Sequence, residues 1–287
     1  MCEEFEIAAI ADRSIDKKDH NPDLLTTTNA LELAENKELD IIIELIGNVE
    51  LSYELLKSSL NNGKHVITAN KALIAMHGHE LFALAQKRNR YIGFEASVAG
   101  AIPIIQALRN SYTNEKIESI VGIINGTSNF ILDKMSTTNC EFSSALNEAQ
   151  ELGYAEADPS FDINGQDAAH KIAILSSLAF GIKPPLKQTY VEGIDQITPM
   201  DINYASELGY VIKHVGITEL EEDRIVSRVH PALISKQNIF AHVADVMNAI
   251  VIQGERFGKS MLYGHGAGGD ATASAVVANL VEAIKFS

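Results

Sequence analysis

The sequence lacks most features that mark secreted or membrane-inserted proteins. Cys2 and Cys140 are its only cysteines, and they form no CxxC pair, so we expect no disulfide framework and a reducing, cytoplasmic setting. The first residues are acidic and lack the basic and then apolar order of a signal peptide. No run of about 18 apolar residues occurs, which predicts that no segment spans a membrane.

Positive charge is also scarce. The 287 residues include 23 Lys and Arg against 38 Asp and Glu, for a formal net charge of −15. This balance argues against binding to the phosphate backbone of nucleic acids and to an anionic membrane surface. A phosphate-bearing ligand would therefore need local features such as backbone amides, helix N-termini or a few well-placed basic side chains.

A third absence concerns the start of the chain. A dinucleotide-binding domain normally begins with a strand, the motif G-x-G-x-x-G and a helix, and nothing before Phe5 supplies them. The first apolar strand, 5–11, ends in Asp12-Arg13 and has the character of the second strand of such a domain, whose terminal residues face the adenosine ribose. Arg13 at this position suits a 2′-phosphate on that ribose better than an acidic residue would. We therefore expect the first βα unit to be missing from this sequence.

Short apolar strands alternate with helices in the first third of the chain. The predicted strands are 5–11, 40–46, 65–68 and 91–94, the predicted helices are 30–37, 52–62 and roughly 78–89, and 14–29 is predicted to be a loop. This alternation is typical of a doubly wound parallel sheet, which binds ligands at the carboxyl ends of its strands. The residues there are Asp12, Arg13, Gly47, Asn48, Asn70, Lys71 and Glu95.

The pattern changes after Glu95. Strands are predicted at 118–125, 190–194, 210–218, 224–229 and 248–253, and helices at 96–110, 128–135, 143–152 and 168–180. Strands without regular intervening helices indicate an antiparallel or mixed sheet with helices on one face. The fold class is thus predicted to be α/β: a Rossmann-like doubly wound parallel sheet, without its first βα unit, plus an α+β substrate and dimerisation domain. We place the nucleotide-binding domain at 1–96 and 267–287, and the second domain at 97–266.

A glycine-rich segment, 264–269, precedes a helix for which Asp270 is a good N-cap. Such a segment suits an anion or a flat ring that approaches the main chain. An ordinary glycine-rich turn is the alternative for this motif taken alone.

The segment 153–171 contains the best candidate for catalysis. An acidic, turn-rich loop precedes a helix in which Asp167 and Lys171 are four residues apart and share one face. The alternative to a catalytic role is a solvated surface ion pair that contributes a few tenths of a kcal/mol to stability. The same face continues with Ile174, Leu175 and Leu178, and acids beside a partly desolvated lysine are how a proton donor is held and tuned.

Together these motifs resemble the homoserine dehydrogenase family over nearly the whole chain. The motifs are Ala-Asp-Arg (11–13), Glu-Leu-Ile-Gly (44–47), Thr-Ala-Asn-Lys (68–71), Glu-Ala-Ser-Val-Ala-Gly-Ala-Ile-Pro (95–103), Asn-Gly-Thr-Ser-Asn (125–129), the segment 153–171 and the Gly-Ala-Gly-Gly-Asp tail (266–270). The resemblance implies reduction of L-aspartate 4-semialdehyde to L-homoserine with NAD(P)H, on the route to threonine, methionine and isoleucine. It also suggests a homodimer formed through the second domain. Since the sequence ends at Ser287 without the C-terminal ACT domain of many relatives, we expect no threonine regulation through such a domain.

The resemblance also implies roles for individual residues. Lys171 would protonate the aldehyde oxygen, where hydride transfer develops negative charge, and the acids would hold the substrate and its ammonium group. The cofactor preference between NAD and NADP stays open, with Arg13 and Lys71 favouring NADP. The implied residues are Lys171, Asp167 and Lys71 for catalysis; Glu156, Asp162 and Asp167 for substrate; Arg13, Lys71 and Gly268 for cofactor; and Glu95 with the carbonyls of Val98, Gly100 and Ile102 for a monovalent cation, usually sodium.

Other interpretations are weaker. His77 and His79 could suggest a metal pair, but residues two apart on a helix do not share a face. No G-x-S-x-G motif indicates a hydrolase. Without the resemblance, Lys71 could be a solvated loop lysine and Glu95 a helix-initiating acid. The alternative from another class is a catalytically silent dinucleotide-fold protein that binds a metabolite or acts as an assembly subunit.

Overall fold

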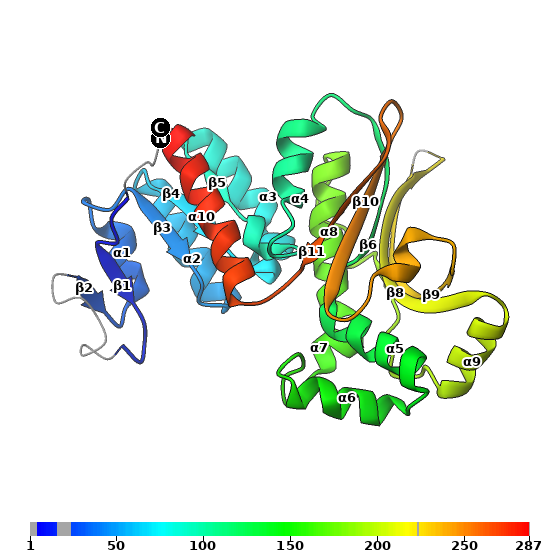
Figure 1. Ribbon diagram of the computed structural model, residues 1–287. Coiled ribbons are helices and arrows are strands. Elements are labelled where there is room, and N and C mark those ends of the chain that lie inside the picture. Colours follow the sequence, from blue (N-terminus) through cyan, green and yellow to red (C-terminus); the bar gives the residue numbers. More distant parts are fainter. Residues whose placement is uncertain (1–4, 16–23, 223, 287) are drawn as a thin grey trace. The chain divides into compact units, whose positions relative to one another are not determined.

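The computed structural model describes residues 5–15, 24–222 and 224–286. The chain divides into two compact units (Figure 1). Unit 1 comprises 1–97 and 273–287, and unit 2 comprises 98–272.

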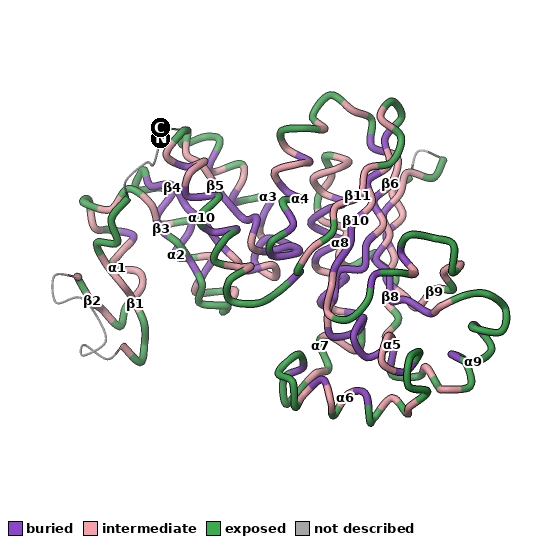
Figure 2. The backbone as a smooth tube through the Cα atoms, in the orientation of Figure 1, coloured by how far each residue is buried: buried purple, intermediate pink, exposed green. Residues whose placement is uncertain are grey.

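Unit 1 is built on parallel strands. Its elements are β1 (Ala9–Ala11), β2 (Leu25–Thr27), α1 (Ala30–Glu35), β3 (Ile41–Glu44), α2 (Val49–Asn61), β4 (His65–Thr68), α3 (Lys71–Arg88), β5 (Ile92–Gly93), η1 (Glu95–Ser97) and, from residue 273 onward, α10 (Gly269–Phe286). Among the described residues the strands form two sheets, β1-β2 and β3-β4-β5, and every pairing is parallel. β4 is buried along its whole length (Figure 2), as expected for a strand covered on both faces. Val276 and Leu280 of α10 pack on Ile67 of β4.

The largest differences from the predictions in unit 1 concern β2 and α3; in addition, β1 is shorter than predicted and α2 begins three residues earlier. Strand β2 lies inside 14–29, which was predicted to be a loop; part of that range, 16–23, is outside the described residues. Helix α3 begins at Lys71, several residues before the predicted start. The reason is the Asn70 side chain, which accepts a hydrogen bond from the Leu73 amide and caps the helix.

Unit 2 contains a larger sheet and most of the helices. Its elements are α4 (Ile104–Gln106), the π-helical turn η2 (Ala107–Ser111), β6 (Ile117–Ile123), α5 (Gly126–Thr138), α6 (Phe142–Glu151), α7 (Ser160–Ile163), α8 (Gln166–Phe180), β7 (Tyr190–Val191), α9 (Pro199–Glu207), β8 (Tyr210–Glu221), β9 (Arg224–Ser235), η3 (Ile239–His242), β10 (Met247–Gly254) and β11 (Gly258–His265). In the described part of the chain the strand order is β11-β10-β6-β8-β9-β7. Only the β7–β9 pairing is parallel there, so the sheet is mixed.

Helix α8 packs against β8 and β9. Most of its residues from Asp167 to Ser176 are buried (Figure 2). The prediction of an α/β fold with a parallel sheet, followed by a mixed sheet with helices, is therefore confirmed.

Several details of unit 2 and the tail were missed or wrong. The segment before Asp167, predicted to be a loop, contains the short helix α7, and the helix predicted at 96–110 is α-helical only from Ile104 and continues as the π-helical turn η2. Strand β11 was not predicted, since it contains no β-branched residue. Helix α9 was also missed, although Thr198 and Asp201 form a capping box that the sequence displays. Helix α10 begins at Gly269, so Asp270 lies in its first turn and is not its N-cap.

Candidate active site

Asp167 and Lys171 form a buried ion pair on α8. The Lys171 Nζ lies 2.7 Å from Asp167 Oδ2, and the two side chains are 10% and 4% exposed. The Lys171 Nζ also donates a hydrogen bond to the Ile124 carbonyl at 2.7 Å. An ammonium has three donors, so these two contacts leave one N–H for a ligand. The bland alternative of a solvated surface pair is excluded by this burial.

Asn125 connects the ion pair to the acidic loop. Its Nδ2 donates to Asp167 Oδ2 at 2.9 Å and to Asp162 Oδ1 at 2.7 Å. Its Oδ1 accepts a hydrogen bond from the Ser128 amide, which makes Asn125 the N-cap of α5. Both polar atoms of one amide are therefore engaged, and the side chain has a single orientation. Asn125 was not assigned a role from the sequence; its signal was the Asn-Gly-Thr-Ser turn directly after a predicted strand.

The turn between α7 and α8 sets the position of Asp167. Gly165 has φ of +83°, and a Cβ there would lie 3.0 Å from the Val191 side chain and 3.2 Å from the His214 ring, so only glycine fits. The buried His214 Nε2 donates to the Glu192 carbonyl at 2.9 Å. Burial lowers the pKa of His214 below its usual value, and the bond to Glu192 opposes that shift. His214 is therefore a neutral support beneath the turn.

The predicted substrate acids occupy different environments. Asp162 is half-buried and bonded to Asn125. Glu156 is exposed, and its carboxylate makes no hydrogen bond or ion pair to the described residues; its backbone carbonyl accepts from Gln150 Nε2 at 3.0 Å. The Asn125 amide thus joins Asp162 to Asp167, which in turn pairs with Lys171. The Glu156 carboxylate has no partner among the described residues.

In unit 1, polar side chains meet at the carboxyl ends of β3 and β4. Glu44 is 1% exposed. Its Oε2 accepts from Thr68 Oγ1 at 2.5 Å, and its Oε1 accepts from the amides of Ile46 and Gly47 at 2.6 and 3.3 Å. Glu44 therefore shapes the turn after β3, a role that the sequence did not reveal. Lys71 is half-buried as the first residue of α3.

The remaining predicted residues lie in turns. Arg13 follows β1 and is exposed. Gly268 has φ of +114°, and no atom lies within 4 Å of the position that a Cβ would take, so its backbone is open to a ligand. Glu95 in unit 1 is buried, and its backbone amide donates a hydrogen bond to Asn279 Oδ1 at 2.8 Å.

The turn at 98–102 in unit 2 has an unusual backbone. Ala99 and Gly100 have φ of +56° and +41°. The Ile102 carbonyl accepts from the Ile104 amide at 2.7 Å. The described residues contain no cluster of three or more His, Cys, Asp or Glu side chains suited to a metal, so the His77 and His79 pair gains no support.

Comparisons with known proteins extend these observations. A homoserine dehydrogenase family model matches residues 103–281, and a second, described as the NAD binding domain of homoserine dehydrogenase, matches 2–95. A homoserine dehydrogenase of Pseudomonas aeruginosa is 47% identical over 281 residues, which is 98% of this chain and 65% of that protein. One from Helicobacter pylori is 47% identical over 93% of this chain and 63% of its own length.

Solved structures show the same similarity. The homoserine dehydrogenase of Thiobacillus denitrificans has a TM-score of 0.92 and 50% identity, covering 96% of this chain and 64% of that one. A hyperthermophilic archaeal homoserine dehydrogenase in complex with NADPH has a TM-score of 0.80 and 31% identity, covering 91% of this chain and 76% of that one.

The chain combines a parallel-sheet unit with a mixed-sheet unit that contains a buried lysine–aspartate pair. This architecture suits dehydrogenases, which bind a dinucleotide at the ends of parallel strands. The chain belongs to the homoserine dehydrogenase family. It spans less than two thirds of the length of the curated relatives described above. No helix among its described residues is long and apolar enough to cross a membrane.

Proposed function

We propose that this chain reduces L-aspartate 4-semialdehyde to L-homoserine with a nicotinamide cofactor, in the biosynthesis of threonine and methionine. The observation that supports the proposal is the state of Lys171: it is buried and paired with Asp167, and one N–H remains available. An ion pair needed only for solubility would be solvated.

The chemistry assigns a task to each group of unit 2. When bound, the nicotinamide supplies the hydride. Lys171 stabilises the negative charge that develops on the aldehyde oxygen and donates the proton to it. Asp167 orients the lysine, and its Oδ2 accepts hydrogen bonds from both Asn125 and Lys171. The Ile124 carbonyl occupies a second N–H of Lys171, so the remaining N–H is directed at the substrate.

An amino-acid substrate brings an ammonium group that needs an acidic partner. The Glu156 carboxylate suits this role because it is exposed and unpaired among the described residues. Asp162 lies on the short helix α7 that follows the Glu156 loop, and it is held by Asn125. Glu156 therefore binds the substrate ammonium, with Asp162 beside it and Asp167 toward the reacting end.

Gly268, Lys71 and Arg13 are the residues that we assign to the cofactor. The open backbone at Gly268 fits a flat ring or a phosphate approaching the main chain. Arg13 follows β1, and its guanidinium suits the 2′-phosphate of NADP. The archaeal relative was solved with NADPH. We expect a higher kcat/KM with NADPH than with NADH, and a loss of this preference in Arg13→Ala; equal use of both cofactors would contradict the assignment.

A monovalent cation, sodium by preference, is assigned to Glu95 and to the carbonyls of Val98, Gly100 and Ile102. Glu95 is buried in unit 1, and the turn at 98–102 in unit 2 contains two left-handed residues. A carboxylate and main-chain carbonyls are the hard oxygen donors that such a cation prefers. Activity that does not change when sodium is replaced by a bulky organic cation would contradict this assignment.

We also propose a homodimer formed through unit 2. Partly buried apolar side chains of Met261, Val251, Val121 and Ile217 are register partners on β11, β10, β6 and β8, so they form one row across the sheet. A second copy that covers this row would bury apolar surface that is otherwise in contact with water. Sedimentation equilibrium that gives a monomer at micromolar concentration would contradict the dimer.

Replacement of the proton donor tests the proposed reaction. Lys171→Met keeps the length of the side chain and removes the donor, so we expect kcat to fall by about 10³-fold, within the range for lost general-acid catalysis. Cofactor oxidation with aspartate semialdehyde is the measurement, and Lys183→Met, an exposed lysine of the same unit, is the control. Cofactor binding without turnover in the unaltered chain would instead identify a silent binding protein and refute the proposal.

A further inference from the structure

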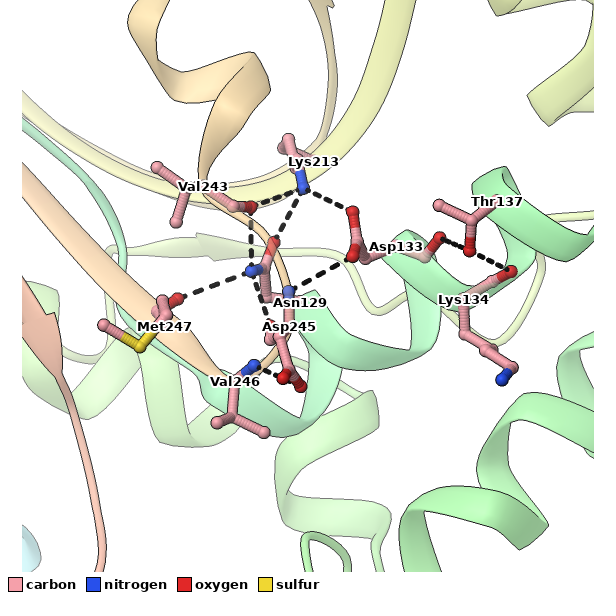
Figure 3. Close-up of polar contacts among 9 residues, drawn as sticks. All are labelled: Asn129, Asp133, Lys134, Thr137, Lys213, Val243, Asp245, Val246 and Met247. Atoms are coloured by element: carbon pink, nitrogen blue, oxygen red, sulfur yellow. Dashed lines mark hydrogen bonds and ion pairs between the residues drawn. The ribbon is translucent and has the colours of Figure 1, made fainter.

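Unit 2 contains a second buried lysine, Lys213, that the proposed reaction does not use. Lys213 lies on β8 and is 2% exposed. Its Nζ donates to the Val243 carbonyl at 2.7 Å and to Asn129 Oδ1 at 3.1 Å, and lies 3.6 Å from Asp133 Oδ1 (Figure 3). Burial lowers the pKa of Lys213, and Asp133 opposes the shift. Unlike Lys171, this ammonium has a partner for each of its three donors, so it has none left for a ligand.

The partners of Lys213 hold the segment 243–247 against α5. Asn129 Nδ2 faces three carbonyls of this segment, those of Val243, Asp245 and Met247, at 3.1, 2.8 and 3.4 Å (Figure 3). Asp133 Oδ2 accepts the Asp245 amide at 3.2 Å. Asp245 has φ of +56°, a conformation that is uncommon for a residue with a side chain. We name Asn129, Asp133 and Lys213 the α5 clamp.

The clamp follows one stripe of α5 toward the active site. Asn129 and Asp133 are four residues apart and share a face. Gly126 lies one turn earlier, where a Cβ would stand only 2.7 Å from the Val246 carbonyl. The segment 243–247 therefore packs along α5 from Asp133 back to Gly126, the first residue of the helix.

The first turn of α5 is also the support of the ion pair. Ile124 and Asn125, which directly precede the helix, contact Lys171 and Asp167 respectively. A shift of α5 against the sheet moves both contacts, because the backbone is continuous from Ile124 into the helix. The geometry of Lys171 therefore depends on whatever fixes α5.

We propose that Lys213 is a positioning residue for the reaction: with Asn129 and Asp133 it fixes α5, so that Ile124 and Asn125 hold Lys171 and Asp167 in place. This inference rests on the proposed function. Stability alone does not call for a charge here, since well-packed apolar groups often replace a buried ion pair without loss. A lysine is needed because three acceptors converge on one point and an ammonium can donate to all of them. Two of the acceptors, Asn129 and Asp133, lie on α5, and the third, the Val243 carbonyl, lies on the neighbouring segment.

Lys213→Met tests the proposal. We expect kcat to fall by about tenfold, in line with the cost of a small misplacement of catalytic groups, with a much smaller change in KM for the substrate. The pH profile of kcat and the side-chain chemical shifts of Lys171, observed in lysine-labelled protein and assigned with Lys171→Met, should both move. Lys134→Met is the matched control, because Lys134 is the residue after Asp133 on α5 and pairs with Glu148 away from the clamp. It should leave all of these readouts unchanged.

Asp133→Asn covers the case in which Lys213→Met does not fold. Asp133 is partly exposed, and the asparagine keeps its shape while removing the charge opposite Lys213; the same readouts should move in the same direction, with kcat lower by about threefold. Unchanged pH profiles and Lys171 chemical shifts in the variants that fold would overturn the proposal, even if thermal stability falls. A lack of turnover in the unaltered chain would refute the proposed function instead, and the chemical shifts would still test the positioning role.

Discussion

Buried charges in the two units are stabilised over different distances along the chain. In unit 1, Glu44 is bonded to its own turn and to Thr68, 24 residues away, and Lys64 donates to the carbonyls of Asn36 and Leu39, at most 28 residues away. In unit 2, Lys213 reaches Asn129 across 84 residues, and Asn129 reaches Asp245 across 116. Glu44 and Lys64 thus depend on one or two neighbouring βα turns, whereas Lys213 and its partners require the assembled sheet of unit 2.

The largest effect that tests this contrast is expected in unit 1. Glu44→Ala should lower the free energy of unfolding by about 3 kcal/mol, because it leaves the buried Thr68 hydroxyl and the amides of Ile46 and Gly47 without an acceptor and creates a cavity. Hydrogen exchange should show lost protection in β3 and β4 and unchanged protection in β8 and β9. The exposed Glu38→Ala is the control, and an equal loss in both units would contradict the local character of Glu44.

A smaller effect is expected in unit 2, where the turn after β11 approaches the start of β10. Gly266→Ala would place a Cβ 1.8 Å from Asn248 Nδ2, and Asn248 is 1% exposed and unable to turn away into solvent. Such overpacking should cost about 2 kcal/mol of stability, measured by urea unfolding.

Two further variants make the Gly266 test specific. Both polar atoms of Asn248 are buried without a hydrogen-bond partner in the described part of the chain, so adding Asn248→Ala should relieve the clash and recover most of the lost stability. Gly269→Ala, where no atom lies within 4 Å of the new Cβ, should be close to neutral. A double variant no more stable than Gly266→Ala would show that the contact with Asn248 is not the cause.

The smallest effect concerns acid stability, where each unit contains one buried histidine among its described residues. Burial lowers the pKa of both His65 and His214. Below a pH of about 6.5 the unfolded chain binds protons that the folded histidines do not. The free energy of unfolding therefore decreases as the pH is lowered, by at most about 1.4 kcal/mol per pH unit for each histidine. His214→Gln should reduce this slope for unit 2 alone and His65→Gln for unit 1 alone, as measured by hydrogen exchange between pH 5 and 7. A slope that neither substitution changes would exclude the histidines as its origin.

The elements predicted best are those with a local signal. The apolar run 65–68 is β4, and the four-residue spacing of Asp167 and Lys171 alone places them on one face of α8. Elements with weak local signals were missed: β11 has no β-branched residue. Its pairing with β10 across eight residue pairs, from Met247–His265 to Gly254–Gly258, stabilises it as a strand nevertheless.

The candidate active site likewise combines features that a local sequence signal predicts with features that depend on distant residues. The sequence by itself determined that Asp167 and Lys171 are neighbours, because a helix brings residues four apart together whatever surrounds it. Only the tertiary structure decided that the pair is buried and bonded to Ile124 and Asn125, since these contacts span 47 and 42 residues. It also decided that Lys213 belongs to the same region of the molecule. Nothing in the residues next to Lys213 indicates this, because its partners come from α5 and from the segment before β10.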